Sequence, residues 1–577
     1  MKSLLKYFNK VKKECVMGPL FKLLEASFEL IIPIVISDLI DKGITGGAGR
    51  NYISTRVLIM VLLGVIGLSC SVTAQYFSAK AATNFSARVR SALFKHIQTF
   101  SYAQIDTIGT STMITRMTAD VNQLQSGVNM TLRLFLRSPF IVIGAMVMAF
   151  SIDKKCSLIF LVVIILLSIV VYGVMIITMP KQRKVQESVD SILEKTRDNL
   201  SGVRVLRAFR KEKSEINAFR ENNETLVDRQ IVTEKIGALT NPITYVIVNL
   251  GLIVLIYAGA VKVNIGELSQ GQVVALTNYM SQILVELIKL ANFIVLDIKA
   301  LASAKRIEQV LNMNEQMVEG SLELDCDKAP EIVFEDVIFS YNNASDKALE
   351  GISFTAKSGE TVGIIGGTGS GKTTIINLIG RYYDVSGGRV MINGRNVKEY
   401  CIESLRKNVA MTPQKAVLFS GSIRDNMKWA NENADDFAIN EALNNAMAGD
   451  FVNEKEGGLD YMVNAGGKNL SGGQRQRLTV ARALLKKTGI LVLDDSSSAL
   501  DAITDKKLRE NIMKLKEHPT LFIVSQRTAA VMNADKIIVL DDGKMVGIGK
   551  HEELIKSCSV YKEIYDSQVK TEDNAKA

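Results

Sequence analysis

The sequence has little cysteine and little histidine. It holds six cysteines and three histidines in 577 residues, with no CxxC pair and no histidine at metal-ligand spacing from a cysteine. The cysteines are Cys15, Cys70, Cys156, Cys326, Cys401 and Cys558. A zinc centre or a disulfide framework is therefore not expected, and the thiols are interpreted as reduced or buried.

Tracts of low complexity are also absent. Only the polar C-terminal segment 567–577 has the composition of a disordered tail, because it offers too little apolar surface to repay the entropy of ordering. The rest of the chain is expected to fold.

Positive charge is scarce in three short connections, at 41–55, 153–155 and 262–267. It is abundant in two long ones, with seven Lys or Arg between Lys80 and Arg137 and thirteen between Lys181 and Lys235. The net charge of +9 is therefore interpreted by the positive-inside rule, which places the long connections, the N-terminus and the C-terminal half in the cytoplasm. A nucleic-acid partner is not expected.

Long apolar runs are what the sequence does have. Uncharged stretches at 57–79, 156–179 and 236–261 match the roughly 20 residues that carry a helix across a bilayer. Weaker candidates lie at 16–40, 138–152 and 268–285. Six spans in a cell membrane are therefore predicted, and the helical pattern of the long connections predicts that the spanning helices continue into the cytoplasm.

The composition and the pattern of apolar residues change after residue 312. We expect a transmembrane domain over 1–312, with a basic interfacial elbow helix at its start, and a polar acidic linker over 313–330. From 331 to 566, short β-branched runs such as TVGIIG and ILVLDD alternate with helical segments. The fold class predicted is thus an all-α membrane domain followed by an α/β domain with a largely parallel sheet.

A phosphate-binding loop, GGTGSGKT, stands at 366–373 between a strand and a helix. Glycines let backbone N–H groups converge on phosphate oxygens, Lys372 brings a positive charge to them, and the Thr373 hydroxyl can ligate Mg²⁺. The residues predicted at ATP from this loop are Gly366, Thr368, Gly369, Ser370, Gly371, Lys372, Thr373 and Thr374. The apolar strand at 490–493 ends in Asp494, whose carboxylate is predicted to hold Mg²⁺ through water.

The stretch LSGGQRQR at 470–477 is the most specific in the sequence. A serine and two glycines that open a helix can present a hydroxyl and backbone donors to a phosphate, although an ordinary serine N-cap explains the helix start equally well. Its position between the phosphate loop and ILVLDD resembles the signature of ABC-type ATPases. With six spans ahead of it, the whole chain resembles one half of a type IV ABC exporter of the multidrug-exporter class.

The resemblance implies roles for further residues. Tyr341 matches the aromatic that stacks on adenine, Gln414 the glutamine that touches Mg²⁺ and the attacking water, and 498–501, with Asp501, the loop that crosses to the opposite site. Ser471, Gly472, Gly473 and Gln474 match the signature that serves the partner's ATP. The stretches FSYAQIDTIGTSTMITRMTADVNQLQ and NLSGVRVLRAFRKE resemble those that carry coupling helices, with solvated helices as the alternative.

Two positions depart from the family pattern. Asp495 stands where the family has a catalytic glutamate, and Gln526 where it usually has a histidine that contacts the γ-phosphate. The resemblance therefore implies that this chain's own site binds ATP with Mg²⁺ but hydrolyses it slowly, and that a second half-transporter supplies the main catalytic carboxylate. A homodimer with two slow sites remains the alternative.

Charged residues in the first predicted span bear on the cargo. Lys22, Glu25 and Glu29 fall on one helix face, and a charge at the bilayer centre costs roughly 2.5 to 3.5 kcal/mol on insertion scales. Glu25 and Glu29 are therefore candidates for a substrate cavity that takes amphipathic cations, with Tyr279, Met280 and Gln282 as neighbours; pairing of Lys22 with Glu25 is the alternative. An exporter of amphipathic or lipid-like molecules is the first hypothesis. An importer of the same fold and an ATP-gated channel or regulator are the others.

Overall fold

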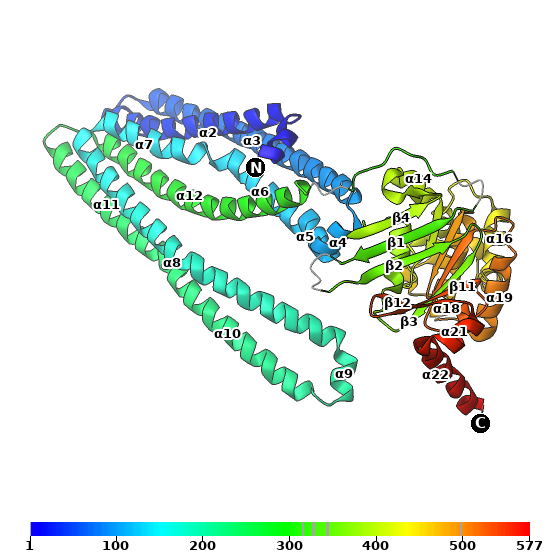
Figure 1. Cartoon of the computed structure of the whole chain (residues 1–577). Helices are drawn as coiled ribbons and strands as arrows, with labels where there is room; N and C mark the ends of the chain where they lie inside the picture. The colour runs from blue at the N-terminus through cyan, green and yellow to red at the C-terminus, as the bar shows by residue number, and fades with distance from the viewer. Residues whose placement is uncertain (1, 314–316, 326–328, 342–345, 497–498, 577) are drawn as a thin grey trace. The chain divides into compact units, whose positions relative to one another are not determined.

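The chain forms two compact units in the structure, a computed structural model that describes residues 2–313, 317–325, 329–341, 346–496 and 499–576. One unit consists of Met1–Gln98 and Ser111–Met313, the other of Thr99–Thr110 and Asn314–Ala577. Figure 1 traces the chain through both. The change in sequence pattern after residue 312 thus lies close to the boundary between the helical unit and the α/β unit.

The helical unit is built from long helices. Its principal ones are α2 (Lys12–Asp38), α3 (Arg50–Gln98), α6 (Val121–Leu134), α7 (Arg137–Ile152), α8 (Lys154–Ser201), α10 (Glu212–Ala238), α11 (Thr240–Asn264) and α12 (Gln270–Leu311). The short helices α5 (Thr110–Thr115) and α9 (Val203–Ala208) lie between them. With 49, 48 and 42 residues, α3, α8 and α12 are each about twice as long as a bilayer core requires. These lengths leave room for extensions beyond the bilayer, and the cytoplasmic position of such extensions stays a prediction.

Four helical stretches among the described residues are long and apolar enough to cross a membrane by length and composition: Arg50–Gln98, Thr110–Ile152, Lys154–Ser201 and Glu212–Asn264. The first and sixth predicted spans, in α2 and α12, are not among the four. Lys22, Glu25 and Glu29 interrupt the apolar part of α2, and polar residues lower the mean hydropathy of α12. Both helices nevertheless pack in the same core as the apolar ones, through Leu30 and Tyr279, so the bundle contains all six predicted spans as helices.

The N-terminal segment differs from the single elbow helix that its sequence suggests. It forms α1 (Lys2–Leu5) and one 3-10 turn (Lys6–Phe8), and α2 begins at Lys12. Leu4 is buried in a cluster that includes Phe85 and Ile307. The Phe8 ring also stacks on Phe85 with centroids 4.1 Å apart, so tertiary packing holds the segment, which helical periodicity alone does not reveal.

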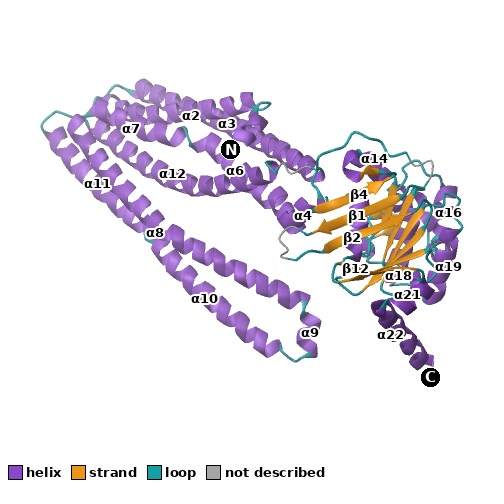
Figure 2. Cartoon of the chain, in the orientation of Figure 1, coloured by secondary structure: helices purple, strands orange, loops and turns teal. Residues whose placement is uncertain are grey.

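The second unit holds two sheets, drawn as orange arrows among purple helices in Figure 2. The larger has the order β12-β11-β3-β10-β9-β6, with β12 antiparallel and the other five strands parallel. Its strands are β3 (Thr361–Gly366), β6 (Val409–Thr412), β9 (Ile490–Asp494), β10 (Thr520–Ser525), β11 (Lys536–Asp541) and β12 (Lys544–Gly549). The smaller, antiparallel sheet has β1 (Ile332–Phe339), β2 (Leu349–Ala356), β4 (Gly387–Ile392) and β5 (Arg395–Asn396).

The helices of this unit are short by comparison. They are α4 (Tyr102–Ile108), α13 (Lys372–Ile379), α14 (Ile402–Lys407), α15 (Ile423–Lys428), α16 (Asp436–Asn445), α17 (Gly449–Asn453), α18 (Gly472–Leu485), α19 (Ala502–Met513), α20 (Thr528–Val531), α21 (His551–Ser557) and α22 (Ser559–Lys576). A two-stranded ribbon pairs β7 (Gly421–Ser422) with β8 (Met462–Val463). The strands of the large sheet read as continuous apolar runs because helices cover both faces of a parallel sheet.

Two segments differ from their sequence-based expectation. The linker was expected to be a polar connection, but Leu324 is buried in the α/β core, and Leu322 pairs with Tyr400 in an isolated bridge. The C-terminal segment was expected to be disordered, whereas α22 continues to Lys576. Residues 567–576 contain no glycine or proline, so nothing in the backbone chemistry ends a helix that the core has already started.

Helix α4, from the first predicted coupling stretch, belongs to the α/β unit. The Tyr102 ring stacks on Tyr382 with centroids 4.8 Å apart, and the Tyr383 hydroxyl donates to Asp106 Oδ2 at 2.6 Å. Burial, with Asp106 adding to it, raises the pKa of Tyr383. Helix α4 is thus held to the α/β unit by a stacked aromatic pair and a hydrogen bond, and its role as a coupling helix stays a prediction.

Candidate functional site

The carboxyl ends of three parallel strands meet at one edge of the large sheet. Strand β10 lies between β3 and β9, and the register sets Val524 beside both Ile364 and Asp494. Ligands of open α/β sheets bind at this edge. The loop after β3, the carboxylates after β9 and the glutamine after β10 therefore converge.

The phosphate loop depends on glycine at two positions in particular. Gly371 precedes α13 with φ 95°, a left-handed conformation that side chains disfavour. A Cβ at Gly366 would lie 2.2 Å from the Leu540 carbonyl oxygen. The sequence of the loop is thus set by the turn it makes.

Lys372 points back into this loop. Its Nζ donates to the carbonyl oxygens of Gly366 at 3.0 Å and Gly367 at 2.5 Å. Burial lowers the pKa of Lys372, while the nearby Asp495 and Asp494 carboxylates oppose this shift. An ammonium held by neutral carbonyls in a buried loop is well placed to meet phosphate oxygens.

Thr373 and Asp494 form the other half of the phosphate end. The Thr373 hydroxyl donates to Asp494 Oδ2 at 3.1 Å. Burial raises the pKa of Asp494, and the bond from Thr373 is the largest opposing influence. One hydroxyl and one carboxylate fit Mg²⁺, which is usually bound by one or two carboxylates together with substrate phosphates. Within the described residues, no cluster of three or more His, Cys, Asp or Glu side chains that could hold a metal occurs.

Tyr341 lies beside the residue that follows Thr373. Its hydroxyl lies 3.0 Å from Thr374 Oγ1, and its ring meets Tyr383 edge-on at 5.3 Å. The ring is therefore anchored at its edge and its hydroxyl. This geometry suits an aromatic platform for a base, although the ring is also packed against the α/β core through Phe339.

One cavity of about 380 Å³ brings most of the predicted residues together. It is lined by Tyr341, Thr368, Gly369, Gly371, Lys372, Thr373, Thr374, Gln414, Asp494, Asp495 and Gln526, with Ala348, Val524 and Ser525, which were not predicted. Ala348, Val524 and Ser525 have no signature in the sequence. Ala348 precedes β2 and its carbonyl lies close to Gly371, and Val524 and Ser525 end β10, so only the fold brings them to the cavity. Gly366 and Ser370 are part of the loop but not of this lining.

Asp495 and Gln526, the two departures from the family pattern, lie in the same cavity. Asp495 has a positive φ of 45°, and its N–H donates to the Val524 carbonyl oxygen at 2.9 Å. A non-glycine residue in this conformation is held by its surroundings. The aspartate is thus fixed at the end of β9, and its carboxylate extends one methylene less than a glutamate at the same place.

The signature segment does not line this cavity. Ser471 caps α18: its Oγ accepts from Gln474 N at 3.2 Å, and Gln474 Oε1 accepts from Ser471 N at 3.0 Å. The Ser471 hydroxyl keeps its own proton for a further acceptor. Capping and phosphate binding are therefore compatible at Ser471.

Asp501 caps α19 and is exposed. Its Oδ2 accepts from Thr504 N at 3.0 Å, and this bond lowers the pKa of Asp501. Ser498, at the start of the same predicted loop, lies outside the described residues. Neither the signature nor Asp501 approaches this chain's own nucleotide cavity as a lining residue.

The carboxylates proposed for a substrate cavity are already paired. Lys22 Nζ lies 2.5 Å from Glu25 Oε2, and Arg137 Nη2 lies 2.7 Å from Glu29 Oε2. Arg137 also binds Glu286 Oε1 at 2.6 Å, where both side chains are buried. The pairing alternative is thus the one observed for Glu25. Attraction of a cation by unpaired carboxylates is not supported.

The proposed neighbours of that cavity also have structural roles. Tyr279 and Met280 are fully buried, and the Tyr279 hydroxyl donates to the Leu30 carbonyl oxygen at 2.7 Å. Gln282 Nε2 donates to the Glu29 carbonyl oxygen at 3.4 Å. These residues join α12 to α2, which periodicity alone cannot distinguish from lining a cavity.

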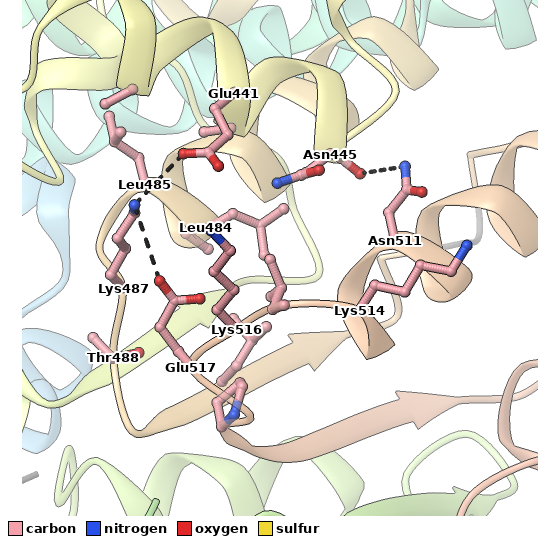
Figure 3. A pocket seen from close by; sticks show the side chains of 16 residues that line it. Glu441, Asn445, Leu484, Leu485, Lys487, Thr488, Asn511, Lys514, Lys516 and Glu517 are labelled. Carbon is pink, nitrogen blue, oxygen red and sulfur yellow. Dashed lines mark hydrogen bonds and ion pairs between the residues drawn. The ribbon is translucent and has the colours of Figure 1, made fainter. Parts of the chain in front are cut away.

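A second hollow in the α/β unit, of about 280 Å³, contains none of the predicted residues. Figure 3 shows Lys487 between Glu441 and Glu517, with ion-pair distances of 3.5 and 3.9 Å. Its labelled charges come from α16, from the turn after α18 and from the segment after α19. Paired surface charges explain this hollow without a ligand.

Comparison with known proteins assigns both units. The family model described as "ABC transporter transmembrane region" matches residues 15–287, and the one described as "ABC transporter" matches residues 349–498. The chain is 34% identical over 548 residues to the uncharacterized ABC transporter ATP-binding protein YfiB of Bacillus subtilis, covering 95% of each. It is 28% identical over 522 residues to the ATP-dependent lipid A-core flippase of Hahella chejuensis, covering 90% of this chain and 89% of that one.

A solved structure shares the fold. The bacterial Atm1-family ABC exporter with ATP bound superposes with a TM-score of 0.82 at 22% identity, over 97% of this chain and 98% of that chain. This chain therefore shares the fold of that protein along nearly its whole length.

Proposed function

This chain belongs to the ABC transporter family, and from that premise we propose that it is the degenerate-site subunit of a heterodimeric exporter. Membership makes it a multi-pass membrane protein with a cytoplasmic ATPase domain and an ATP-hydrolysing transporter. In such a heterodimer, one ATP site contains this chain's phosphate loop and the other contains the partner's, and we propose that the partner's site hydrolyses ATP fast. The observation that carries it is that Asp495 and Gln526 line one cavity with Lys372, Thr373 and Asp494.

The binding residues of that cavity fit ATP with Mg²⁺. Lys372 supplies positive charge to the phosphates, Tyr341 a ring for adenine, and Gln414 a polar group at the cavity wall. Thr373 and Asp494 would hold Mg²⁺, which would neutralise charge on the phosphates. Thr373 is oriented for this by its bond to Asp494.

The catalytic residues fit it less well. A general base must come within about 2.6 to 3.2 Å of the proton it takes, and Asp495 stands on a backbone fixed by Val524. Its carboxylate is one methylene short, and a displacement on the order of 1 Å can cost roughly a hundredfold in rate. Gln526 offers an amide where the family has an imidazole. We infer binding without fast hydrolysis.

The partner follows from the position of the signature. Ser471–Gln474 does not line this chain's own cavity, and its capped geometry leaves a hydroxyl proton and helix N–H groups for a phosphate. We propose that it completes the site of a second half-transporter, which supplies a full catalytic carboxylate. A homodimer would combine two slow sites, which is why the heterodimer is favoured.

The cargo we propose is an amphipathic or lipid-like small molecule. The flippase relative is named for transport of lipid A-core, and the helical unit exposes many large apolar side chains. Because Glu25 is paired with Lys22 and Glu29 with Arg137, a preference for cations is not part of the proposal. An importer of the same fold and an ATP-gated regulator remain the other candidates, and no observation favours them.

Asp495→Glu tests the degenerate site directly. We expect single-turnover hydrolysis at this chain's own site to rise about tenfold or more, because the added methylene restores the reach of the base. Radiolabelled ATP, with the complex in excess, measures it. Asp495→Asn is the matched control and should give no rise. A rate unchanged by Asp495→Glu would contradict the proposal that the short carboxylate limits this site.

A further inference from the structure

The C-terminal helix α22 is anchored by its first half. Tyr561 is fully buried in the α/β core, and its hydroxyl lies 2.7 Å from His551 Nδ1. Ile564 packs against the same core. Gln568 follows at seven and four residues from these two, so it lies on the same helical face. A polar side chain thus continues an apolar stripe.

Both ends of the Gln568 amide are engaged. Its Oε1 accepts from Thr528 N and from Thr528 Oγ1, each at 2.9 Å, and its Nε2 donates to the Gln526 carbonyl oxygen at 2.7 Å. A flipped amide would set NH₂ against N–H and oxygen against oxygen, so only this orientation satisfies the groups. One side chain therefore bridges the backbone on both sides of Arg527.

These bonds replace a helix cap. Helix α20 begins at Thr528, and its N-cap residue Arg527 makes no side-chain capping bond. The Thr528 side chain is buried, so its N–H would otherwise lack water as a partner. Gln568 satisfies this donor from a distant part of the sequence.

The segment held in this way separates two cavities. Asp495 and Gln526 line the nucleotide cavity and also a second cavity of about 900 Å³, to which Gln568 contributes. Asp495 and Gln526, to which we attribute the slow hydrolysis, therefore lie between the two cavities. Gln568 supports that wall from the side away from the nucleotide.

We infer that Gln568 is a positioning residue for the hydrolysis step: it fixes the Gln526 carbonyl and the Thr528 amide, and so holds Gln526 toward the γ-phosphate. This inference rests on the proposed role of Gln526. Gln568 contacts backbone alone at Gln526 and does not line the nucleotide cavity. Its loss therefore affects the rate of the chemical step and leaves nucleotide affinity largely unchanged.

Two substitutions separate the two ends of the amide. Gln568→Ala removes the hydrogen bonds at both ends of the amide, to Thr528 and to the Gln526 carbonyl oxygen. Gln568→Glu keeps an oxygen for Thr528 but places a second oxygen against the Gln526 carbonyl. Asp566→Ala, at an exposed position of the same helix, is the matched control. All are made in the full chain in lipid nanodiscs.

Three readouts are compared: single-turnover ATP hydrolysis, equilibrium binding of a fluorescent ATP analogue, and hydrogen exchange of the peptide covering 520–533. Gln568→Ala is expected to slow hydrolysis about tenfold with the Kd changed less than about twofold, and to speed exchange at Thr528. Gln568→Glu should slow hydrolysis similarly while the Thr528 amide stays protected. Asp566→Ala should change none of the three.

Hydrolysis unchanged in both Gln568 variants, even with faster exchange, would reduce the contact to a structural one and overturn the inference. So would unchanged exchange in Gln568→Ala, because the bond to Thr528 would then not hold in solution. Failure of the unsubstituted chain to bind the ATP analogue would instead overturn the proposed function. Since exchange is measured without nucleotide, the two failures are distinguishable.

Discussion

Replacement of Gly472 by aspartate is expected to stop ATP turnover by the assembled transporter and to leave this chain's own nucleotide binding intact. Gly472 opens α18 beside the Ser471 cap. A Cβ there would meet only Ala499 Cβ at 3.9 Å, which is ordinary contact. An aspartate at a helix N-terminus also favours the helix dipole. The variant should therefore fold.

Its carboxylate would nevertheless stand where the signature presents N–H groups to the partner's ATP. Repulsion of the γ-phosphate, with loss of a preorganised donor site, is expected to lower turnover by at least about a hundredfold. The measurement is steady-state ATPase of the co-purified complex in lipid.

Gly472→Ala is the matched control, because it adds the same Cβ without the charge. It should retain most of the turnover, and both variants should bind an ATP analogue at this chain's own site as the unsubstituted chain does. Equal turnover by the aspartate and alanine complexes would contradict the assignment of the signature to the partner's phosphates.

Substitution of Arg137 by methionine is expected to destabilise the helical unit by about 3 to 5 kcal/mol, the usual cost of stranding a buried charge. Arg137 is the only cation that contacts Glu286 and Glu29 together among the ion pairs of the described residues. Its side chain is 8% exposed and that of Glu286 3%. Removal leaves Glu286 with Ser138 and the half-exposed Lys289.

Thiol labelling measures this unit separately from the other. Cys156 is buried in the helical unit and Cys558 in the α/β unit, so mass spectrometry of each gives one unfolding reporter per unit. Arg137→Met should expose Cys156 at a lower temperature and leave Cys558 nearly unchanged.

Two further variants serve as controls. Lys289→Met removes a cation from the exposed edge of the same cluster and should cost no more than about 1 kcal/mol. Combining Arg137→Met with Glu286→Gln removes the stranded charge and should recover part of the loss. Labelling of Cys156 in Arg137→Met that matches the unsubstituted chain would contradict this account of the cluster.

The parts of the fold that sequence predicts well are those that local chemistry decides. The phosphate loop needs glycine for its turn and lysine for its charge, and both stand in GGTGSGKT. The parallel sheet follows from apolar runs that alternate with helices. Asp494 was placed at the site by the apolar strand that it ends, and Asp495 and Gln526 by the resemblance to ABC-type ATPases.

Contacts between side chains that are far apart in the sequence could not be predicted from local chemistry. Glu25 and Glu29 suggested a cation site only while Arg137 and Glu286, on other helices, were not seen to join them. Tyr279 is a second example. Its position along the helix fits a residue that lines a cavity as well as a buried residue whose hydroxyl donates to a backbone carbonyl, so the sequence alone could not distinguish the two. Gln568 lay in a segment whose polarity suggested disorder, and only its contacts reveal what it holds.

The central claim is that this chain's own site is slow and that a partner supplies the fast one. The most direct test is ATPase turnover of the chain purified alone in lipid, then co-purified with its partner half-transporter, with Asp495→Glu made in each. The account predicts little turnover alone, high turnover with the partner, and little further gain in the complex from the substitution. Brisk turnover by the unsubstituted chain alone would mean that Asp495 suffices as a base, and would contradict the account.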